Sequence, residues 1–260
     1  MKNVCIVLLG GCGNQMFQAA YGLALATRGY HVTFSKDHLM QDGHKVYSLD
    51  LFKIGKSIKF EQDPAAQTIS EHGLSFNPDM LNPPDPSVVF GYWQSEKYFQ
   101  DIRRAVLFAF EPAIEPPADV FVKAEQMRNE SSVFLHVRRG DYTTLQHFHG
   151  MMPLEYYRSA MDLIEEHQGP VKPFLFSDDP KWCHANMPCW AEIVNTGSKL
   201  WDLWLMSQTK HAICANSSYS WWGSWLGDGK PGRVVVAPKQ WFTDKNTDAR
   251  DIIPDRWVKL

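Results

Sequence analysis

The chain has 260 residues, of which 44% are hydrophobic and 21% charged, so it can bury a core and is not a disordered chain. Its formal net charge of -3 gives no general reason to expect a nucleic acid as partner. No apolar run is long enough to cross a bilayer, and the five cysteines form no CxxC pair. We therefore expect a cytoplasmic protein with reduced thiols and no transmembrane segment.

The first half of the chain begins with a strand–turn–helix–strand pattern. The predicted elements are a strand at Val4–Leu9, a tight turn at Gly10–Gly13, a helix from Asn14 to Thr27 and a strand at His31–Phe34. The turn matches the GxGxxG phosphate-binding pattern incompletely, because Met16 takes the place of the third glycine. Asn14 and Gln15 are more distinctive, since they place two amides where the turn opens.

The middle of the chain is less regular. Gln41 to Pro86 shows little periodicity, and its proline-rich end predicts a loop. Val88–Tyr92 predicts a strand, and Ser95–Phe110 predicts a helix with Ser95 as N-cap. Pro112–Pro117 is the best linker candidate, so we expect one domain at 1–117 and a second at 118–260.

The second half alternates between helix and strand, which predicts a doubly wound parallel sheet. The predicted strands are Val133–Leu135, Phe174–Phe176, Ile193–Val194, His211–Cys214 and Val234–Ala237. The predicted helices are Ala118–Asn129, Leu154–His167, one that begins at Pro180, Leu200–Gln208 and Tyr219–Leu226.

The strand that begins at Val133 ends in a run of charged residues. Because side chains alternate along a strand, His136 and Arg138 should share one face, and Val137 and Arg139 the other. Arginine suits phosphate or carboxylate, or it can pair with a nearby acid. We expect Arg138 to face a ligand and Arg139 to be structural.

Polar side chains follow three of the predicted strands, where open α/β sheets bind their ligands. They are His136, Arg138, Ser177, Asp178, Asn216, Ser217 and Ser218. The last three lead into a helix, so they can form an anion site, a plain N-cap, or both. Asp178 and Asp202 suit the donor edges of a base or ribose hydroxyls, although each can equally be a surface carboxylate. Cys183, His184 and Cys189 fit no standard zinc spacing.

Several motifs together resemble glycosyltransferase family 11, which consists mainly of α-1,2-fucosyltransferases. The motifs are GGCGNQ at Gly10–Gln15, GYWQSEKYF at Gly91–Phe99, HVRRGDY at His136–Tyr142, FSDD at Phe176–Asp179 and NSSYSWW at Asn216–Trp222. The resemblance runs from Val7 to Trp257. HxRRGD also recurs in α-1,6- and protein O-fucosyltransferases, whereas its combination with NSSYSWW is more specific.

The resemblance implies an α/β fold of GT-B type, with two Rossmann-like doubly wound domains that face each other across a cleft. It also implies an inverting enzyme that moves L-fucose from GDP-β-L-fucose to the 2-hydroxyl of a galactoside. The second domain would bind GDP-fucose and the first much of the acceptor. The expected partners are therefore GDP-fucose and a galactose-terminated glycan. Transfer to such a glycan is compatible with peripheral association of the enzyme at the inner face of the membrane.

The resemblance assigns roles to particular residues. Donor contacts would come from His136, Arg138, Ser177, Asp178, Asp202, Asn216, Ser217 and Ser218, with Arg138 on the diphosphate and Asp202 on guanine. The catalytic set would be Arg138, Asn14 and Asp141, and the acceptor side would hold Gln15 and Gln94. No residue stands out as the base, for which Asp141, His147, His149 and Glu155 are candidates.

We expect no metal or other cofactor, because Arg138 and a helix N-terminus can neutralise a diphosphate and Asp178-Asp179 does not form a DxD motif. Two other classes remain open. Gly11, Gly13 and Asp37 suit a dinucleotide-dependent oxidoreductase, and the ten tryptophans suit a non-catalytic sugar-binding protein.

Overall fold

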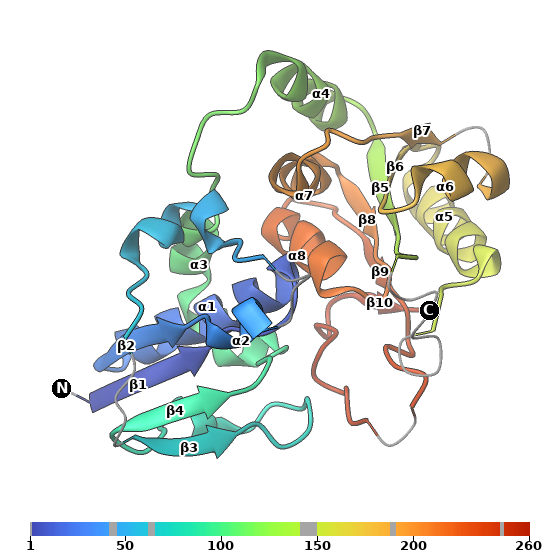
Figure 1. Cartoon of the computed structure of the whole chain (residues 1–260). Coiled ribbons are helices and arrows are strands. Elements are labelled where there is room, and N and C mark those ends of the chain that lie inside the picture. The colour runs from blue at the N-terminus through green and yellow to red at the C-terminus, as the bar shows by residue number, and fades with distance from the viewer. Residues whose placement is uncertain (1, 42–45, 62–65, 141–149, 188–190, 245–246) are drawn as a thin grey trace. The chain divides into compact units, whose positions relative to one another are not determined.

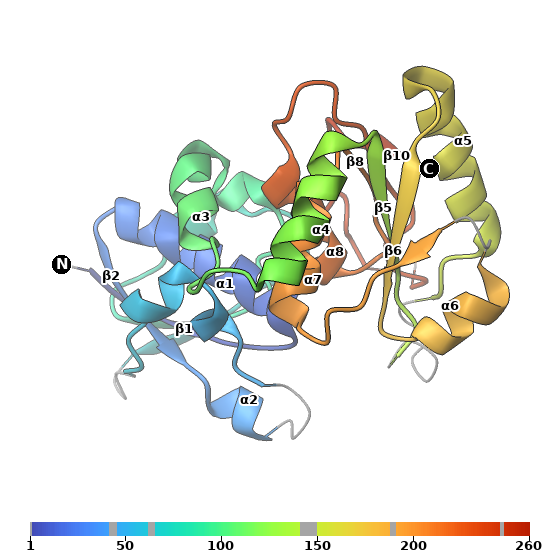
Figure 2. The same cartoon turned by 90° about the horizontal axis from the view of Figure 1, so that it is seen from above.

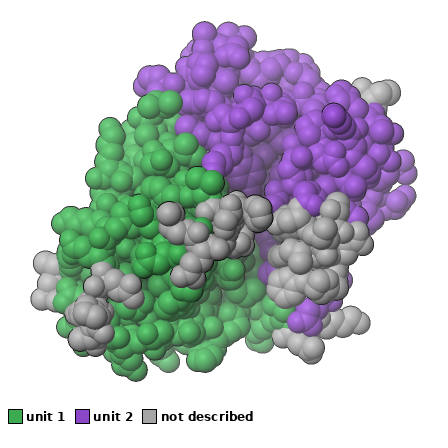
Figure 3. Space-filling model, viewed as in Figure 1, with its two compact units in different colours: residues 1–114, 247–254 green, residues 115–246, 255–260 purple. Residues whose placement is uncertain are grey.

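The structure is a computed structural model that describes residues 2–41, 46–61, 66–140, 150–187, 191–244 and 247–260. Its contacts divide the chain into two compact units, which Figure 3 distinguishes by colour. Unit 1 comprises residues 1–114 and 247–254, and unit 2 comprises residues 115–246 and 255–260. The segment 247–254, which the expected boundary at residue 117 places in the second domain, packs with unit 1.

Unit 1 is built on a four-stranded parallel sheet in the order β2-β1-β4-β3 (Figure 1). Its strands are β1 Lys2–Val7, β2 Tyr30–Ser35, β3 Gln67–Ser70 and β4 Ser87–Phe90. Its α-helices are α1 Cys12–Thr27, α2 Asp37–Gln41 and α3 Arg103–Ala109. Short 3-10 turns fill the connections, at Leu49–Leu51, Lys53–Ser57, Pro78–Leu81, Glu96–Tyr98 and Gln100–Ile102.

Unit 2 is built on a six-stranded parallel sheet in the order β10-β9-β8-β5-β6-β7. The strands are β5 Ser132–Val137, β6 Lys172–Ser177, β7 Glu192–Ile193, β8 His211–Ile213, β9 Val235–Ala237 and β10 Val258–Lys259. The helices are α4 Ala118–Asn129, α5 Leu154–Gln168, α6 Pro180–Asn186, α7 Lys199–Gln208 and α8 Ser218–Gly227. Numbered along the chain, the strands follow the 3-2-1-4-5-6 order of Rossmann-type sheets, with β5 as the first.

Helices cover both faces of the second sheet, with α5 and α6 on one side and α4, α7 and α8 on the other (Figures 1 and 2). All six residues of β5 are buried. Val133, Leu135 and Val137 pack into the core beneath α5 and α6. The alternation predicted for this strand is therefore confirmed, and the intervening residues point towards α8.

Most predicted elements of unit 2 are confirmed to within a few residues. Asp179 caps α6, where its side chain accepts from the Trp182 N–H at 3.0 Å, and Pro180 takes the first helical position. The expected helix at Ser95–Phe110 is wrong in its first half, which forms two 3-10 turns before α3 begins. Tyr98 explains the difference, because its ring packs edge-on against Trp93 and Phe76, and its hydroxyl accepts from the Asn77 N–H.

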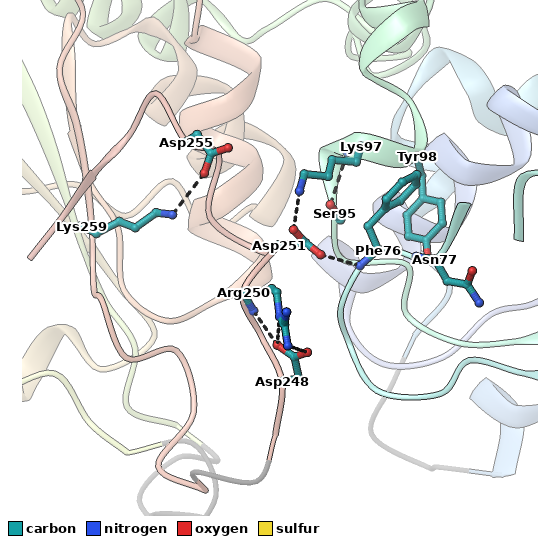
Figure 4. A network of polar contacts seen from close by, with 10 residues as sticks. All are labelled: Phe76, Asn77, Ser95, Lys97, Tyr98, Asp248, Arg250, Asp251, Asp255 and Lys259. Carbon is teal, nitrogen blue, oxygen red and sulfur yellow. Dashed lines mark hydrogen bonds and ion pairs between the residues drawn. The ribbon is translucent and has the colours of Figure 1, made fainter. Parts of the chain in front are cut away.

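The segment 247–254 is joined to the rest of unit 1 by the carboxylate of Asp251. Its Oδ1 pairs with Lys97 Nζ at 2.5 Å, and its Oδ2 accepts from the Phe76 N–H at 2.9 Å (Figure 4). The Asp251 side chain is only 12% exposed, so this carboxylate holds two loops of unit 1 from a largely buried position.

Two expectations about the whole chain can be compared with the described residues. Their four cysteines, Cys5, Cys12, Cys183 and Cys214, form no disulfide bond with one another. No helix within the described segments has the length and apolar character that a membrane span requires.

Candidate active site

The strand order of unit 2 reverses between β5 and β8, which are neighbours in the sheet. At such a switch point the connections leave the carboxyl ends of the two strands in opposite directions, and ligands of open α/β sheets bind there. Arg138 follows the end of β5, and Asn216 and Ser217 lie between the end of β8 and α8. The topology therefore brings the His136–Arg138 and Asn216–Ser218 segments to one edge of the sheet.

His136 lies on the α8 side of β5, and its ring centroid is 5.8 Å from that of Tyr219. The side chain is 4% exposed, and its Nδ1 has no hydrogen-bond partner among the described residues. Burial, with a smaller contribution from Arg138, lowers the pKa of His136 to about 3. His136 is therefore a neutral imidazole at physiological pH, able to exchange a hydrogen bond with a ligand but too weak a base to hold a proton.

Arg138 is held by Asp178, which follows the neighbouring strand β6. Arg138 Nη1 lies 2.7 Å from Asp178 Oδ2, and Asp178 Oδ1 accepts from the Arg139 N–H at 2.9 Å. A Cβ atom at Gly140 would come within 2.6 Å of Asp178 Oδ2, so the turn after Arg139 needs glycine for this close approach. Asp178, predicted to contact the donor, is thus the carboxylate that orients Arg138.

Arg139 lies on the opposite side of the strand from His136, as predicted. Its guanidinium lies over the ring of Trp182 in α6 at 4.0 Å, and its Nε pairs with Asp179 Oδ2 at 3.1 Å. Its side chain is 18% exposed. These contacts give Arg139 a structural role that ties the turn after β5 to α6.

The residues before and within the first turn of α8 serve different purposes. Ser217 is the N-cap, since its hydroxyl accepts from the Tyr219 N–H at 3.3 Å. Ser218 is half-buried, and its hydroxyl makes no hydrogen bond within the described part of the chain. Asn216 is buried, and its amide donates to the carbonyls of Gly150 and Trp241, so it connects three loops.

Ser177 and Asp202 also have protein partners. The Ser177 hydroxyl donates to the Val137 carbonyl at 2.8 Å, which fixes the end of β5 against β6. Asp202 Oδ1 accepts from the backbone and the hydroxyl of Thr196, and no described residue bonds its Oδ2. Burial raises the pKa of Asp202. The Ser177 hydroxyl is thus bound within the sheet, whereas one carboxylate oxygen of Asp202 can accept from a further donor. The donor-sugar contacts expected of both residues stay predictions.

Unit 1 has its own switch point, between β1 and β4, and an amide pair lies beyond these strand ends. Gln94 Nε2 donates to Asn14 Oδ1 at 2.8 Å. Within the described residues, Asn14 Nδ2 and Gln94 Oε1 have no other hydrogen bond. The pair thus offers one donor and one acceptor, the combination that recognises a sugar hydroxyl.

Two neighbours of this pair act through the backbone. Gly10 has a φ of +71° and would clash with Asn14 Nδ2 if it carried a Cβ atom, so Gly10 allows Asn14 to lie over the turn. Gln15 is fully buried. Its Nε2 donates to the carbonyls of Gly10 and Val46, and its Oε1 accepts from the Ser48 N–H. These contacts tie Gln15 to the turn and to the segment Val46–Ser48, and its place on the acceptor side stays a prediction.

The candidates for a catalytic base divide into two groups. Asp141, His147 and His149 lie outside the described residues. Glu155 is in the first turn of α5, where its side chain is 78% exposed and pairs with Arg158 at 3.3 Å. Glu155 is thus an exposed acid on the surface of α5.

One acid in unit 1 was missed by the sequence analysis. Glu71 follows β3, and its carboxylate accepts from the backbone N–H groups of Tyr92 and Trp93, directly before Gln94. It lies in the region of poor periodicity, 21 and 22 residues from its two partners, so no local pattern indicates it.

The two parallel sheets, each with a switch point, place the chain among the doubly wound α/β proteins, whose ligands bind at the carboxyl ends of the strands. The family model "Glycosyl transferase family 11" matches residues 82–260, and the chain belongs to this family. It is therefore a glycosyltransferase, and its fold is of GT-B type, with two α/β units.

Two curated relatives, both from Escherichia coli, are similar to this chain. An "Alpha-1,2-colitosyltransferase" is 31% identical over 294 residues, which cover 100% of this chain and 99% of the relative. An "O-antigen biosynthesis glycosyltransferase WbnK" is 35% identical over 66% of this chain and 60% of the relative.

The solved structures that are similar to this chain share its fold. The NodZ alpha-1,6-fucosyltransferase soaked with GDP-fucose has a TM-score of 0.51 at 14% identity and covers 86% of this chain and 92% of that one. The fucosyltransferase NodZ from Bradyrhizobium has a TM-score of 0.50 at 13% identity, with the same coverage. At this identity the likeness concerns the fold alone.

Family membership removes the two other classes from consideration. Gly11, on which the oxidoreductase interpretation rested, has open space where a Cβ atom would lie, so the turn does not need glycine there. The tryptophans of α8 do not form a sugar-binding surface, because Trp221, Trp222 and Trp225 are fully buried and pack on one another.

Proposed function

We propose that this glycosyltransferase moves L-fucose from GDP-β-L-fucose to the 2-hydroxyl of a galactoside, with inversion at the anomeric carbon. The observation that carries the proposal is the edge of the second sheet, where His136, Arg138 and the first turn of α8 follow adjacent strands. The α-1,2 linkage is supported by the name of the relative that covers the whole chain, and the nucleotide sugar by the family resemblance of the motifs at this edge.

The residues of this edge suit the parts of a nucleotide sugar. Arg138 and the N-terminus of α8 provide positive charge for the two phosphates. Ser218 adds a hydroxyl that has no partner among the described residues, and Asp202 Oδ2 suits the donor edge of guanine. His136 Nδ1 is buried without a described partner, which supports a ligand hydrogen bond at this atom.

A single displacement accounts for inversion. The oxygen of the acceptor hydroxyl forms a bond to the anomeric carbon while the bond from that carbon to the β-phosphate oxygen breaks, and GDP leaves with the electron pair. The hydroxyl proton passes to a base. Arg138 and α8 stabilise the charge that develops on the leaving diphosphate, which is the part of the reaction that most needs electrostatic help.

The acceptor side is assigned to unit 1. The donor Asn14 Nδ2 and the acceptor Gln94 Oε1 can together orient a sugar hydroxyl. Orientation matters because in-line attack requires the hydroxyl oxygen and the leaving oxygen on opposite sides of the anomeric carbon.

The proposal is tested by incubating the protein with GDP-fucose and a panel of galactosides, with GDP release as the rate and NMR of the product as the test of linkage. We expect an α-1,2-fucosylated galactoside. A GDP-activated colitosyl donor and GDP-mannose serve as parallel donors. Preferred transfer from either of these, or a product with another linkage, would refute the corresponding part of the proposal.

A further inference from the structure

Glu71 is a half-buried acid that the proposed reaction does not use. It directly follows β3, and its backbone N–H donates to the Phe90 carbonyl at 2.7 Å, which continues the ladder with β4. Its side chain turns to the segment after β4. Oε2 accepts from the Tyr92 N–H at 2.7 Å, and the two oxygens share the Trp93 N–H at 3.2 Å each.

The backbone that Glu71 holds has an unusual conformation. Trp93 has a φ of +56° and is the one described non-glycine residue with positive φ. For a bulky side chain this left-handed conformation is strained and persists only where the surroundings enforce it. The buried indole stacks on Tyr21 with centroids 4.4 Å apart, and the Ser95 N–H donates to the Trp93 carbonyl. The ring stack and the carboxylate thus hold the turn from opposite ends of the residue.

Gly91 shows that the carboxylate and the turn are fitted to each other. A Cβ atom at this position would come within 2.6 Å of Glu71 Cβ and 2.8 Å of Glu71 Oε2. The Gly91 carbonyl accepts from Gln18 Nε2 at 2.9 Å, so the start of the turn is also fixed to α1. The left-handed residue then delivers Gln94 to Asn14 at 2.8 Å.

Burial raises the pKa of the Glu71 carboxyl to about 7, against the two backbone N–H groups, which lower it. A buried carboxyl is costly to ionise unless its hydrogen bonds offset the lost hydration. This cost supports a role for Glu71 beyond that of an ordinary surface acid.

We infer that Glu71 is a positioning residue for the acceptor. Through the backbone of Tyr92 and Trp93 it sets the left-handed turn that places the Gln94 amide against Asn14. This inference rests on the proposed function, because it takes the amide pair as the group that orients the acceptor hydroxyl. Glu71 itself neither contacts the acceptor nor removes its proton.

The test compares Glu71→Gln with Glu111→Gln, which makes the same chemical change at an exposed acid of unit 1 paired with Lys53. We expect Glu71→Gln to raise the acceptor KM about 10-fold. GDP affinity, measured by calorimetry, and the rate of GDP-fucose hydrolysis without acceptor should remain within about twofold of wild type. Glu111→Gln should match the wild type in all three measurements.

Each alternative result has a definite meaning. An active Glu71→Gln with an unchanged acceptor KM refutes the inference and leaves the proposed function intact. A decrease in kcat of about 100-fold or more with an unchanged acceptor KM also refutes the positioning role, because loss of a catalytic base gives that pattern. A wild type that transfers no fucose refutes the proposed function itself. If Glu71→Gln does not fold, Glu71→Asp provides the test, since its shorter side chain withdraws the carboxylate from the Tyr92 and Trp93 N–H groups.

Discussion

Arg138 Nη1 and Asp178 Oδ2 lie 2.7 Å apart, across the ends of the adjacent strands β5 and β6. The other oxygen of the same carboxylate accepts from the Arg139 N–H. One acid therefore fixes both the guanidinium and the turn that follows it. A guanidinium that is already oriented loses less conformational freedom when an anion binds, which makes the pair suitable for a phosphate site.

Replacing Arg138 should affect activity far more than stability. We expect Arg138→Ala to lower kcat/KM at least about 100-fold, the loss typical of removing a donor from a developing oxyanion. The free energy of unfolding should change by no more than about 1 kcal/mol, because the side chains of Arg138 and Asp178 are about one-quarter to one-third exposed. The control is Arg158→Ala, an arginine that is 61% exposed on α5. Near-normal turnover in Arg138→Ala would show that this guanidinium does not act on the diphosphate.

Replacing Arg139 should have the opposite effect. A fully buried ion pair would cost roughly 3–5 kcal/mol when broken, but Asp179 is 37% exposed, so the pair is screened. The principal loss is the stack on Trp182, about 1–2 kcal/mol. Urea denaturation of Arg139→Ala should show this decrease, with GDP affinity nearly unchanged. An unaltered midpoint would contradict the structural role of Arg139.

The positions of His136 and Arg139 on opposite sides of β5 were predictable, because they follow from strand geometry. A strand that is buried on both faces shows no alternation of polar and apolar residues, yet its period of two still places these side chains on opposite sides. The contacts of His136 with Tyr219 and of Arg139 with Trp182 confirm this placement. The parallel sheet was predictable to a similar extent, since helices alternate with strands throughout unit 2.

Glu71 and Asp251 show what local patterns do not contain. β3 has the sequence QTIS, and most of its residues are exposed. It therefore contains no apolar run that would predict a strand, and without a predicted strand nothing in the sequence marks Glu71. Asp251 contacts Lys97 and Phe76, which are 154 and 175 residues away. The tertiary partners of Asp178 and Gln15 are likewise not specified by the motifs that contain these residues.

Ser217 and Ser218 are adjacent serines for which we expect separable effects. Ser217→Ala removes the cap of α8 and should lower stability by about 1 kcal/mol. Ser218→Ala removes a hydroxyl that has no hydrogen bond to any described residue. It should leave the melting temperature unchanged while weakening GDP-fucose binding about 5- to 10-fold. Thermal melts with and without GDP measure both. Equal loss of ligand stabilisation in the two variants would contradict this separation.

We expect turnover to continue without a divalent cation. Arg138 and the N-terminus of α8 supply the positive charge that a metal would otherwise bring to the diphosphate. Initial rates should be the same after dialysis against EDTA as before it, and added magnesium or manganese should raise them less than twofold. Loss of turnover in EDTA followed by recovery with either ion would show that the protein charges are insufficient.

The groups around Glu71 determine how its titration can be observed. The hydroxyls of Tyr21 on α1 and of Tyr98 interact electrostatically with the Glu71 carboxylate. Burial raises the pKa of both hydroxyls, to about 12 for Tyr98. The nearby carboxylate of Asp251 is paired with Lys97, so the two charges largely cancel. Neither tyrosine ionises near neutral pH, so neither masks the titration of Glu71.

Ionisation of Glu71 should lower the stability of the fold and favour acceptor binding over the same range of pH. Its pKa rises from 4.5 to about 7 on folding, so its contribution to stability is present below pH 4.5 and is lost as pH rises through 7, by about 3 kcal/mol. Glu71→Gln should therefore become more stable than wild type by about this amount above pH 7, whereas Glu111→Gln should not. Over that interval the wild-type acceptor KM should fall, because the ionised carboxylate accepts both N–H groups, and the KM of Glu71→Gln should stay constant. Parallel pH profiles of KM in the two proteins would contradict this assignment.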